Sequence, residues 1–87
     1  MGLRVRIAGH ADRFGSARYN LSLSQRRAES VRRYLAAKGV KEEDAILVAL
    51  GESQPVVTCA GAPTPATKAC LAPNRRVEIQ AAADGPA

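Results

Sequence analysis

Aromatic residues are scarce in this 87-residue chain, which has no tryptophan and only Phe14, Tyr19 and Tyr34. Most of its apolar residues are alanine, valine and leucine, so a single small domain with a thin core is expected. No run of about 18 apolar residues exists, and we expect no segment to span a membrane. Since no apolar stretch follows the basic residues near the start, we expect any export signal to lie upstream of Met1.

The chain is also poor in residues that carry catalysis or bind metals. Its two cysteines and single histidine, His10, cannot complete a structural zinc site. No nucleophile accompanies His10, for which a structural hydrogen bond is the expected role, and the serines show no triad spacing. We therefore expect no enzyme, no metal and no cofactor.

The formal net charge of +5 is compatible with nucleic acid or another anionic partner. The basic residues, however, are divided among two expected strands and one helix, without an aromatic platform on which bases could stack. A mixed, solvated face is the simpler interpretation. Nucleic-acid binding is kept as a weaker alternative, and no nucleic-acid partner is expected.

Cys59 and Cys70 bracket a loop rich in glycine, proline, threonine and alanine. Two buried free thiols are one possibility, but this composition does not resemble a core segment. A disulfide is favoured, which implies an oxidising compartment. Closing a loop of this size would stabilise the fold by roughly 3 kcal/mol in the chain-entropy model.

Hydrophobic periodicity predicts the main elements. Residues 3–8 alternate as in a half-exposed strand that ends at Gly9, and residues 10–21 form a polar loop. A helix follows, with its N-cap at Ser22 or Ser24. Gly39 is expected just after its C-terminus, in a Schellman motif. The apolar stripe of this helix is formed by Ala28, Val31 and Leu35.

The second half of the chain predicts two more strands. Residues 46–50 form a continuous apolar run typical of a strand buried on both faces, residues 52–72 a loop, and residues 75–81 an alternating strand. The first two strands should be parallel, which gives an α+β, two-layer βαββ fold with a mixed sheet and the helix on one face. The domain would occupy residues 1–81, with residues 82–87 as a flexible tail.

One helix covers only part of a three-stranded sheet, so an apolar face needs a partner. A segment upstream of Met1 could supply it, or a second copy of the chain could. We expect a homodimer.

Arg27 differs from its neighbours in its place on the helix. It lies on the edge of the apolar stripe and should be partly buried, whereas Arg26, Arg32 and Arg33 should be solvated. A partly buried arginine near a helix N-terminus favours an anion, so this corner is predicted to bind a carboxylate. The alternative is an internal pair with Asp12 or Glu29.

Asp12 follows the first strand at its carboxyl end, the same edge at which the helix begins. Asp12 and Arg27 can therefore converge, and such a pair suits a zwitterion that carries an ammonium and a carboxylate. A turn or Asx cap is an equal alternative for Asp12.

Three segments now stand out: 9–12 (Gly-His-Ala-Asp), 19–28 (Tyr-Asn-Leu-Ser-Leu-Ser-Gln-Arg-Arg-Ala) and 74–79 (Asn-Arg-Arg-Val-Glu-Ile). Together they resemble the OmpA-like C-terminal domain, a non-covalent peptidoglycan-binding module of Gram-negative envelopes. The resemblance extends from Leu3 to Gln80, while the family's first strand and helix, which contribute part of the pocket, are lacking. Similar domains occur in outer-membrane porins, peptidoglycan-associated lipoproteins and flagellar-motor stators.

This resemblance implies that Asp12 receives the amino group of diaminopimelate in the peptidoglycan stem peptide and that Arg27 holds its carboxylate. Ala11 replaces the family's usual threonine, which removes a hydroxyl near the pocket. The two cysteines resemble the disulfide loop of one subset of the family. The remaining positions that match the family's binding pattern are Gly15, Tyr19, Asn20, Leu23 and, as a supporting residue, Arg76.

The expected function is thus non-covalent peptidoglycan binding that anchors an outer-membrane protein to the cell wall in the periplasm. The alternative is a structural, self-associating module. In that case Asp12 and Arg27 would pair with each other, and the exposed sheet face would form a dimer without binding a ligand.

Overall fold

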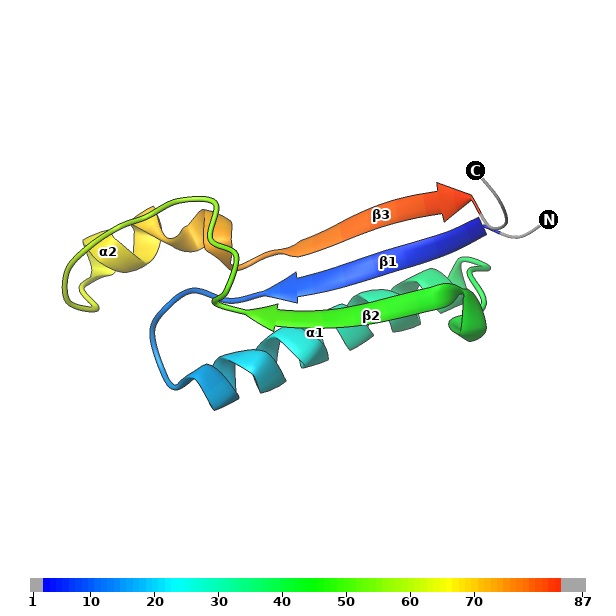
Figure 1. The fold of residues 1–87 in the computed structure, drawn as a ribbon, viewed down its shortest axis with the longest axis horizontal. Helices are drawn as coiled ribbons and strands as arrows, with labels where there is room; N and C mark the ends of the chain where they lie inside the picture. Colours follow the sequence, from blue (N-terminus) through cyan, green and yellow to red (C-terminus); the bar gives the residue numbers. More distant parts are fainter. Residues whose placement is uncertain (1–2, 84–87) are drawn as a thin grey trace.

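The computed structural model describes residues 3–83 as a three-stranded sheet with one long helix and one short helix (Figure 1). The elements follow the order β1 (Leu3–His10), α1 (Ala17–Ala37), a 3₁₀ turn (Glu42–Asp44), β2 (Ala45–Gly51), α2 (Pro65–Cys70), a second 3₁₀ turn (Ala72–Asn74) and β3 (Val77–Ala83).

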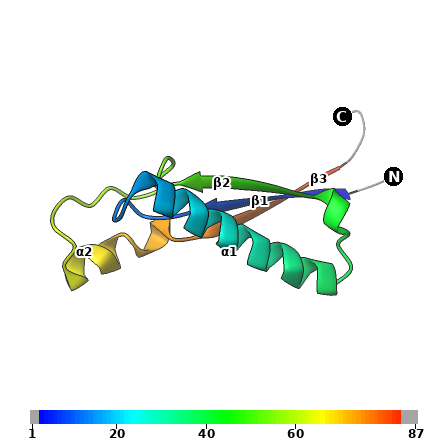
Figure 2. The same ribbon diagram turned by 90° about the horizontal axis from the view of Figure 1, so that it is seen from below.

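The sheet has the order β2-β1-β3, with β1 parallel to β2 and antiparallel to β3. Helix α1 crosses one face of this sheet (Figure 2) and lies mainly over β1 and β2. The predicted α+β architecture, the mixed sheet and the parallel first pair of strands are therefore confirmed.

The core lies between α1 and the central strand. Val5, Ile7 and Ala28 are buried at its centre, and Val31 and Leu35 pack against them, as the predicted stripe requires. The C-terminus of α1 is also as predicted. The N–H of Val40 donates to the carbonyl of Leu35 at 3.0 Å, which is the Schellman hydrogen bond.

The N-terminus of α1 lies earlier than predicted. The helix begins at Ala17, and its N-cap is Ser16, whose Oγ accepts a hydrogen bond from the N–H of Tyr19. Ser24, one of the two predicted caps, is instead fully buried inside the helix, where its Oγ donates to Leu21 and accepts from the N–H of Gly51. Because the Ser24 hydroxyl already bonds to Leu21 and Gly51, it does not cap the N-terminus of α1.

Helix α1 approaches the sheet closely because the residues that meet at the crossing, Gly9 on β1 and Ser24 on α1, are small. A Cβ atom built on Gly9 would lie 1.9 Å from the carbonyl oxygen of Ser24. Strand β1 also continues through Gly9 to His10, one residue beyond the predicted end. Gly9 is therefore a contact point between strand and helix, rather than a strand terminator.

Three further predictions need correction. Strand β2 is not buried on both faces, since Ile46 is 46% exposed on the face that α1 leaves uncovered. The expected loop 52–72 contains α2, which begins with Thr64 as N-cap and Pro65 in its first turn. Strand β3 begins at Val77 and runs to Ala83, past the predicted boundary at Ala81, and residues 84–87 of the expected tail lie outside the described residues.

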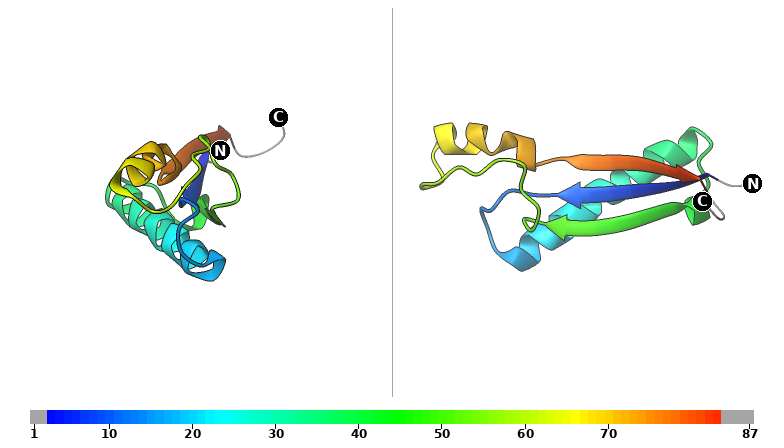
Figure 3. Two further views of the ribbon diagram at one scale, coloured as in Figure 1. Left: turned by 90° about the vertical axis from the view of Figure 1, so that its left-hand side faces the viewer. Right: turned by 45° about the horizontal axis from the view of Figure 1, so that its top comes forward.

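The expected disulfide between Cys59 and Cys70 is formed. The connection between β2 and β3, residues 52–76, carries this cross-link and is called the disulfide segment below. With α2 it extends beyond the carboxyl end of β1 (Figure 3). Among residues 3–83, no helix combines the length and the apolar composition that crossing a membrane requires.

Candidate binding site

The candidate site lies where β1 ends, α1 begins and the disulfide segment folds back (Figure 1). Asp12 is in the loop between β1 and α1, and its side chain is only 13% exposed. Its Oδ1 accepts a hydrogen bond of 3.0 Å from the N–H of Phe14. This Asx turn fixes the orientation of the carboxylate.

Asn20 shapes this loop from within the first turns of α1. It is buried, and its Nδ2 donates to the carbonyls of Asp12 and Phe14 at 3.1 Å each. The same amide lies 3.4 Å from Oε1 of Glu52. Gly15, whose φ of +93° is in the left-handed region, permits the sharp turn between Asp12 and the start of α1. Asn20 and Gly15 thus build the loop that carries Asp12.

Arg27 reaches the same end of β1. Its side chain is half-buried, and Nη1 donates to the carbonyl of His10 at 3.2 Å, two residues before Asp12. Within the described residues no carboxylate lies within 4 Å of this guanidinium, so the internal pair with Asp12 or Glu29 is not formed. Leu23, one turn earlier, is half-buried, and Tyr19 is 54% exposed.

The other arginines of α1 follow the prediction with one exception. Arg26 and Arg33 are exposed. The side chain of Arg32 is only 19% exposed and lies 3.0 Å from Glu42, an acid in the turn that follows α1. The helical periodicity places Arg32 on the polar face of α1, but the turn that follows the helix folds back and covers its side chain.

The ion-pair partner of Asp12 is Arg75, which sequence reasoning missed. Nη1 of Arg75 lies 2.8 Å from Oδ2 of Asp12 and also donates to the carbonyl of Lys68 at 3.1 Å. Arg75 follows the second 3₁₀ turn directly and Arg76 connects it to β3, so neither lies in the strand that the sequence predicted over residues 75–81. The alternation expected for that strand therefore gave no signal for the role of Arg75.

Arg76 lies with His10 and Glu78. Its Nε donates to Oε2 of Glu78 at 2.6 Å, and its Nη2 donates to the carbonyl of Gln54 at 3.1 Å. His10 is fully buried, and neither ring nitrogen has a hydrogen bond in the described part of the chain. Nε2 of His10 is 3.4 Å from Oε1 of Glu78, so the structural hydrogen bond expected for His10 is replaced by this looser contact.

This buried histidine predicts a pH dependence of stability. Burial, Arg76 and Arg6 lower the pKa of His10 below its ordinary 6.5, against the opposing effect of Glu78. The unfolded chain then binds more protons than the folded one. The free energy of unfolding therefore has its full value above pH 6.5 and decreases as the pH falls below 6.5. Urea denaturation at pH 7.5 and 5.0 should show this loss, and His10→Phe should flatten it.

The hydrogen bond from Arg76 also lowers the pKa of Glu78 below its ordinary 4.5. The contribution of the Glu78 carboxylate to stability is therefore lost only as the pH falls below 4.5, which is outside the interval from pH 7.5 to 5.0 that tests His10. An equal loss in wild type and His10→Phe between pH 7.5 and 5.0 would exclude His10 as the titrating group.

A small cavity adjoins the site between the Asp12 loop and the disulfide segment. Apolar atoms dominate its lining, to which both loops contribute Ala11, Pro55, Val57, Cys59 and Leu71. No group of three potential metal ligands lies together in residues 3–83. The site offers instead a carboxylate fixed by hydrogen bonds, an arginine without an acidic partner in the described part of the chain and an apolar recess, which together suit recognition of a small zwitterion.

Comparison with known proteins agrees with the fold and with the motifs around this site. The model of a family described as the OmpA family matches residues 2–69. The chain belongs to the OmpA family. It is 47% identical to outer membrane protein A of Yersinia pseudotuberculosis over 79 residues, which cover 87% of this chain and 22% of that protein. The corresponding identity to outer membrane protein P5 of Haemophilus influenzae is 46%, with the same coverage.

Solved structures of related domains show the same arrangement. The peptidoglycan-associated lipoprotein of Burkholderia pseudomallei superposes with a TM-score of 0.76 at 36% identity, covering 92% of this chain and 63% of that one. The C-terminal domain of Helicobacter pylori MotB gives a TM-score of 0.69 at 22% identity, covering 94% and 59%, and supports the fold alone. This OmpA-family chain thus spans between about a fifth and a third of the outer membrane proteins that it matches.

Proposed function

We propose that this OmpA-family domain binds peptidoglycan non-covalently, through the diaminopimelate of the stem peptide, and so anchors an outer-membrane protein to the cell wall. It acts in the periplasm by recognition, without catalysis. Membership of the family supports the general function, and a relative of solved structure is named a peptidoglycan-associated lipoprotein. The disulfide agrees with an oxidising compartment.

The observation that carries the proposal is the state of Arg27. Its guanidinium is half-buried at the end of β1, is held by a backbone carbonyl and has no acidic partner within the described residues. A partly desolvated cation without a counter-ion favours an incoming anion, and the guanidinium fork matches a carboxylate. The second carboxylate of diaminopimelate is the group that we assign to it.

Asp12 supplies the complementary charge. Phe14 and Arg75 each take one acceptor position of its carboxylate, while a carboxylate has about four such positions. An ammonium group can therefore bind Asp12 beside Arg75. The cavity next to Ala11 provides apolar surface for the neighbouring part of the ligand.

The test is an NMR titration of the oxidised protein with a stem peptide that contains diaminopimelate. We expect shifts centred on Asp12, Asn20 and Arg27. The control is a peptide with lysine in place of diaminopimelate, which keeps the ammonium but lacks the second carboxylate, and should cause much smaller shifts. A well-dispersed spectrum that responds to neither peptide would contradict the proposal.

Self-association is the second candidate, favoured by the exposed edge of the sheet. Strand β3 is an edge strand of the described sheet, and Ile79 on it is 54% exposed. Unpaired strand edges with apolar side chains readily pair with another chain. Sedimentation velocity should then show a dimer that Ile79→Lys converts to monomer, while ligand binding stays unchanged. A monomer at all concentrations would exclude this candidate.

A further inference from the structure

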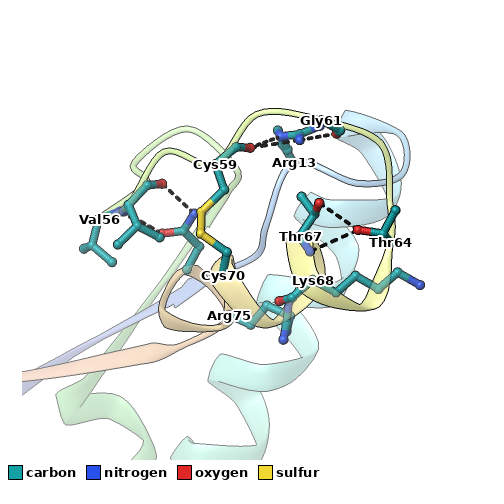
Figure 4. The surroundings of a disulfide bond; sticks show 11 residues. Arg13, Val56, Cys59, Gly61, Thr64, Thr67, Lys68, Cys70 and Arg75 are labelled. Atoms are coloured by element: carbon teal, nitrogen blue, oxygen red, sulfur yellow. Dashed lines mark hydrogen bonds between the residues drawn. A yellow bond between two sulfur atoms is a disulfide. The ribbon is translucent and has the colours of Figure 1, made fainter.

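The Cys59 half of the disulfide segment is fastened to the loop that carries Asp12. The guanidinium of Arg13, the residue after Asp12, donates to the carbonyl of Cys59 through Nε at 3.0 Å and Nη2 at 2.9 Å. Nη2 also donates to the carbonyl of Gly61 (Figure 4). A fork held at both carbonyls leaves Arg13, and the backbone beside Asp12, little freedom.

The Cys70 half is fastened to the Asp12 side chain itself. Arg75 binds Oδ2 of Asp12 and, through the same nitrogen, the carbonyl of Lys68 in α2, two residues before Cys70. Figure 4 shows Lys68 and Arg75 beside Cys70 and, on the opposite side of the disulfide, Arg13 next to Cys59. The two cysteines therefore join two contacts, one of which ends at the Asp12 side chain and the other at Arg13, the residue after Asp12.

The base of the segment is closed by Asn74, which is buried. Its Oδ1 accepts hydrogen bonds from the N–H groups of Val56 and Val57, and its Nδ2 donates to the carbonyl of Val57. This amide holds the segment together near the sheet. Farther out, the disulfide is a direct cross-link between the half bound by Arg13 and the half bound by Arg75, which the backbone joins only through residues 60–69.

We infer that Arg13 and Arg75 are positioning residues, through which the Cys59–Cys70 disulfide sets the place of the Asp12 carboxylate. The inference rests on the proposed function, in which that carboxylate receives an ammonium group. Binding and disulfide formation must then be thermodynamically coupled. If the disulfide raises the ligand affinity by some factor, the ligand raises the disulfide's resistance to reduction by the same factor.

The experiment measures the dissociation constant for the diaminopimelate peptide in five samples: wild type and Arg13→Gln, each oxidised and reduced, and oxidised Arg75→Gln. Dithiothreitol serves as the reductant. Its two thiols pass two electrons and two protons to the Cys59–Cys70 disulfide, which becomes two thiols, and it closes into its own cyclic disulfide. Arg33→Gln, an exposed position near the far end of α1 with the same change of charge, is the control.

We expect reduction to weaken binding by wild type about 10-fold, within the usual range of coupling between sites. Arg13→Gln should weaken binding by a similar factor while still oxidised, and its reduction should then have little further effect. Equal affinities of oxidised and reduced wild type, or additive effects of reduction and Arg13→Gln, would overturn the inference. So would tighter binding by Arg75→Gln, because Arg75 would then compete with the ligand rather than position its acceptor.

A second readout does not depend on the ligand. The amide of Phe14 donates to Asp12, so its NMR shift reports the position of that carboxylate. Reduction of wild type should move this signal and leave the core amides of Ile7 and Ala28 unchanged, whereas reduction of Arg13→Gln should move it much less. If the peptide binds no form of the protein, the proposed function fails, and the Phe14 shift alone decides the positioning role. An unmoved Phe14 signal would overturn that role.

Discussion

Gly9→Ala should lower the free energy of unfolding by about 3 kcal/mol, the upper part of the usual range for overpacked sites. The added Cβ would lie 1.9 Å from the carbonyl oxygen of Ser24, a backbone atom that no rotamer change can remove. Helix α1 would have to retreat from β1 and lose contacts around Ile7 and Ala28. Because a small domain has little stability to spare, urea or thermal denaturation should show a large shift.

Gly39→Ala is the matched control for this prediction. Gly39 has a φ of +104° and open space around its Cβ position, so alanine there meets backbone strain of about 1 to 2 kcal/mol but no steric contact. We expect Gly9→Ala to be the more damaging of the two. A milder effect at Gly9 than at Gly39 would show that helix and strand can separate at little cost.

Arg27→Gln should weaken binding of the diaminopimelate peptide by about 10- to 100-fold, the usual worth of a hydrogen bond to a charged group. The substitution removes the cation that we assign to the ligand carboxylate. The lysine peptide lacks that carboxylate, so its weaker affinity should change little. The variant should therefore lose most of the preference for diaminopimelate, which calorimetry or NMR titration with both peptides can measure.

Arg26→Gln is the control, because it makes the same change of charge one residue away, at an exposed position of the same helix. It should leave the affinity nearly unchanged. A purely structural role of Arg27, through its hydrogen bond to the carbonyl of His10, makes the opposite prediction, namely a clear loss of stability without a change of ligand preference. Measuring the free energy of unfolding of both variants separates the two possibilities.

Much of the fold follows from local patterns. The period-two alternation of β1, the helical stripe of Ala28, Val31 and Leu35, and the glycine after α1 each depend on residues close together in the chain. The start of α1 could not be read in this way. Ser16, Ser22 and Ser24 are all residues that favour the N-cap position. Ser24 lies inside the helix because it packs against Gly9 and accepts a hydrogen bond from Gly51, and both are contacts with the sheet.

Helix α2 was missed for a related reason. It has six residues, too few to be stable as an isolated helix or to show a clear apolar stripe. A cap at Thr64 supports its first turn, and the disulfide at Cys70 attaches its last turn to the chain near Cys59. The covalent bond, rather than the propensity of these residues, makes the short helix part of the structure.

The sequence by itself determined the α+β class, the parallel pairing of the first two strands, the cysteine pair and the placing of Asp12 and Arg27 at one edge of the sheet. These features depend on periodicity and chain direction, which are local properties. Only the tertiary structure decided that Asp12 pairs with Arg75 instead of Arg27, because Asp12 and Arg75 are 63 positions apart in the chain. The fold of the disulfide segment brings them together, and leaves the guanidinium of Arg27 without an acidic partner among the described residues.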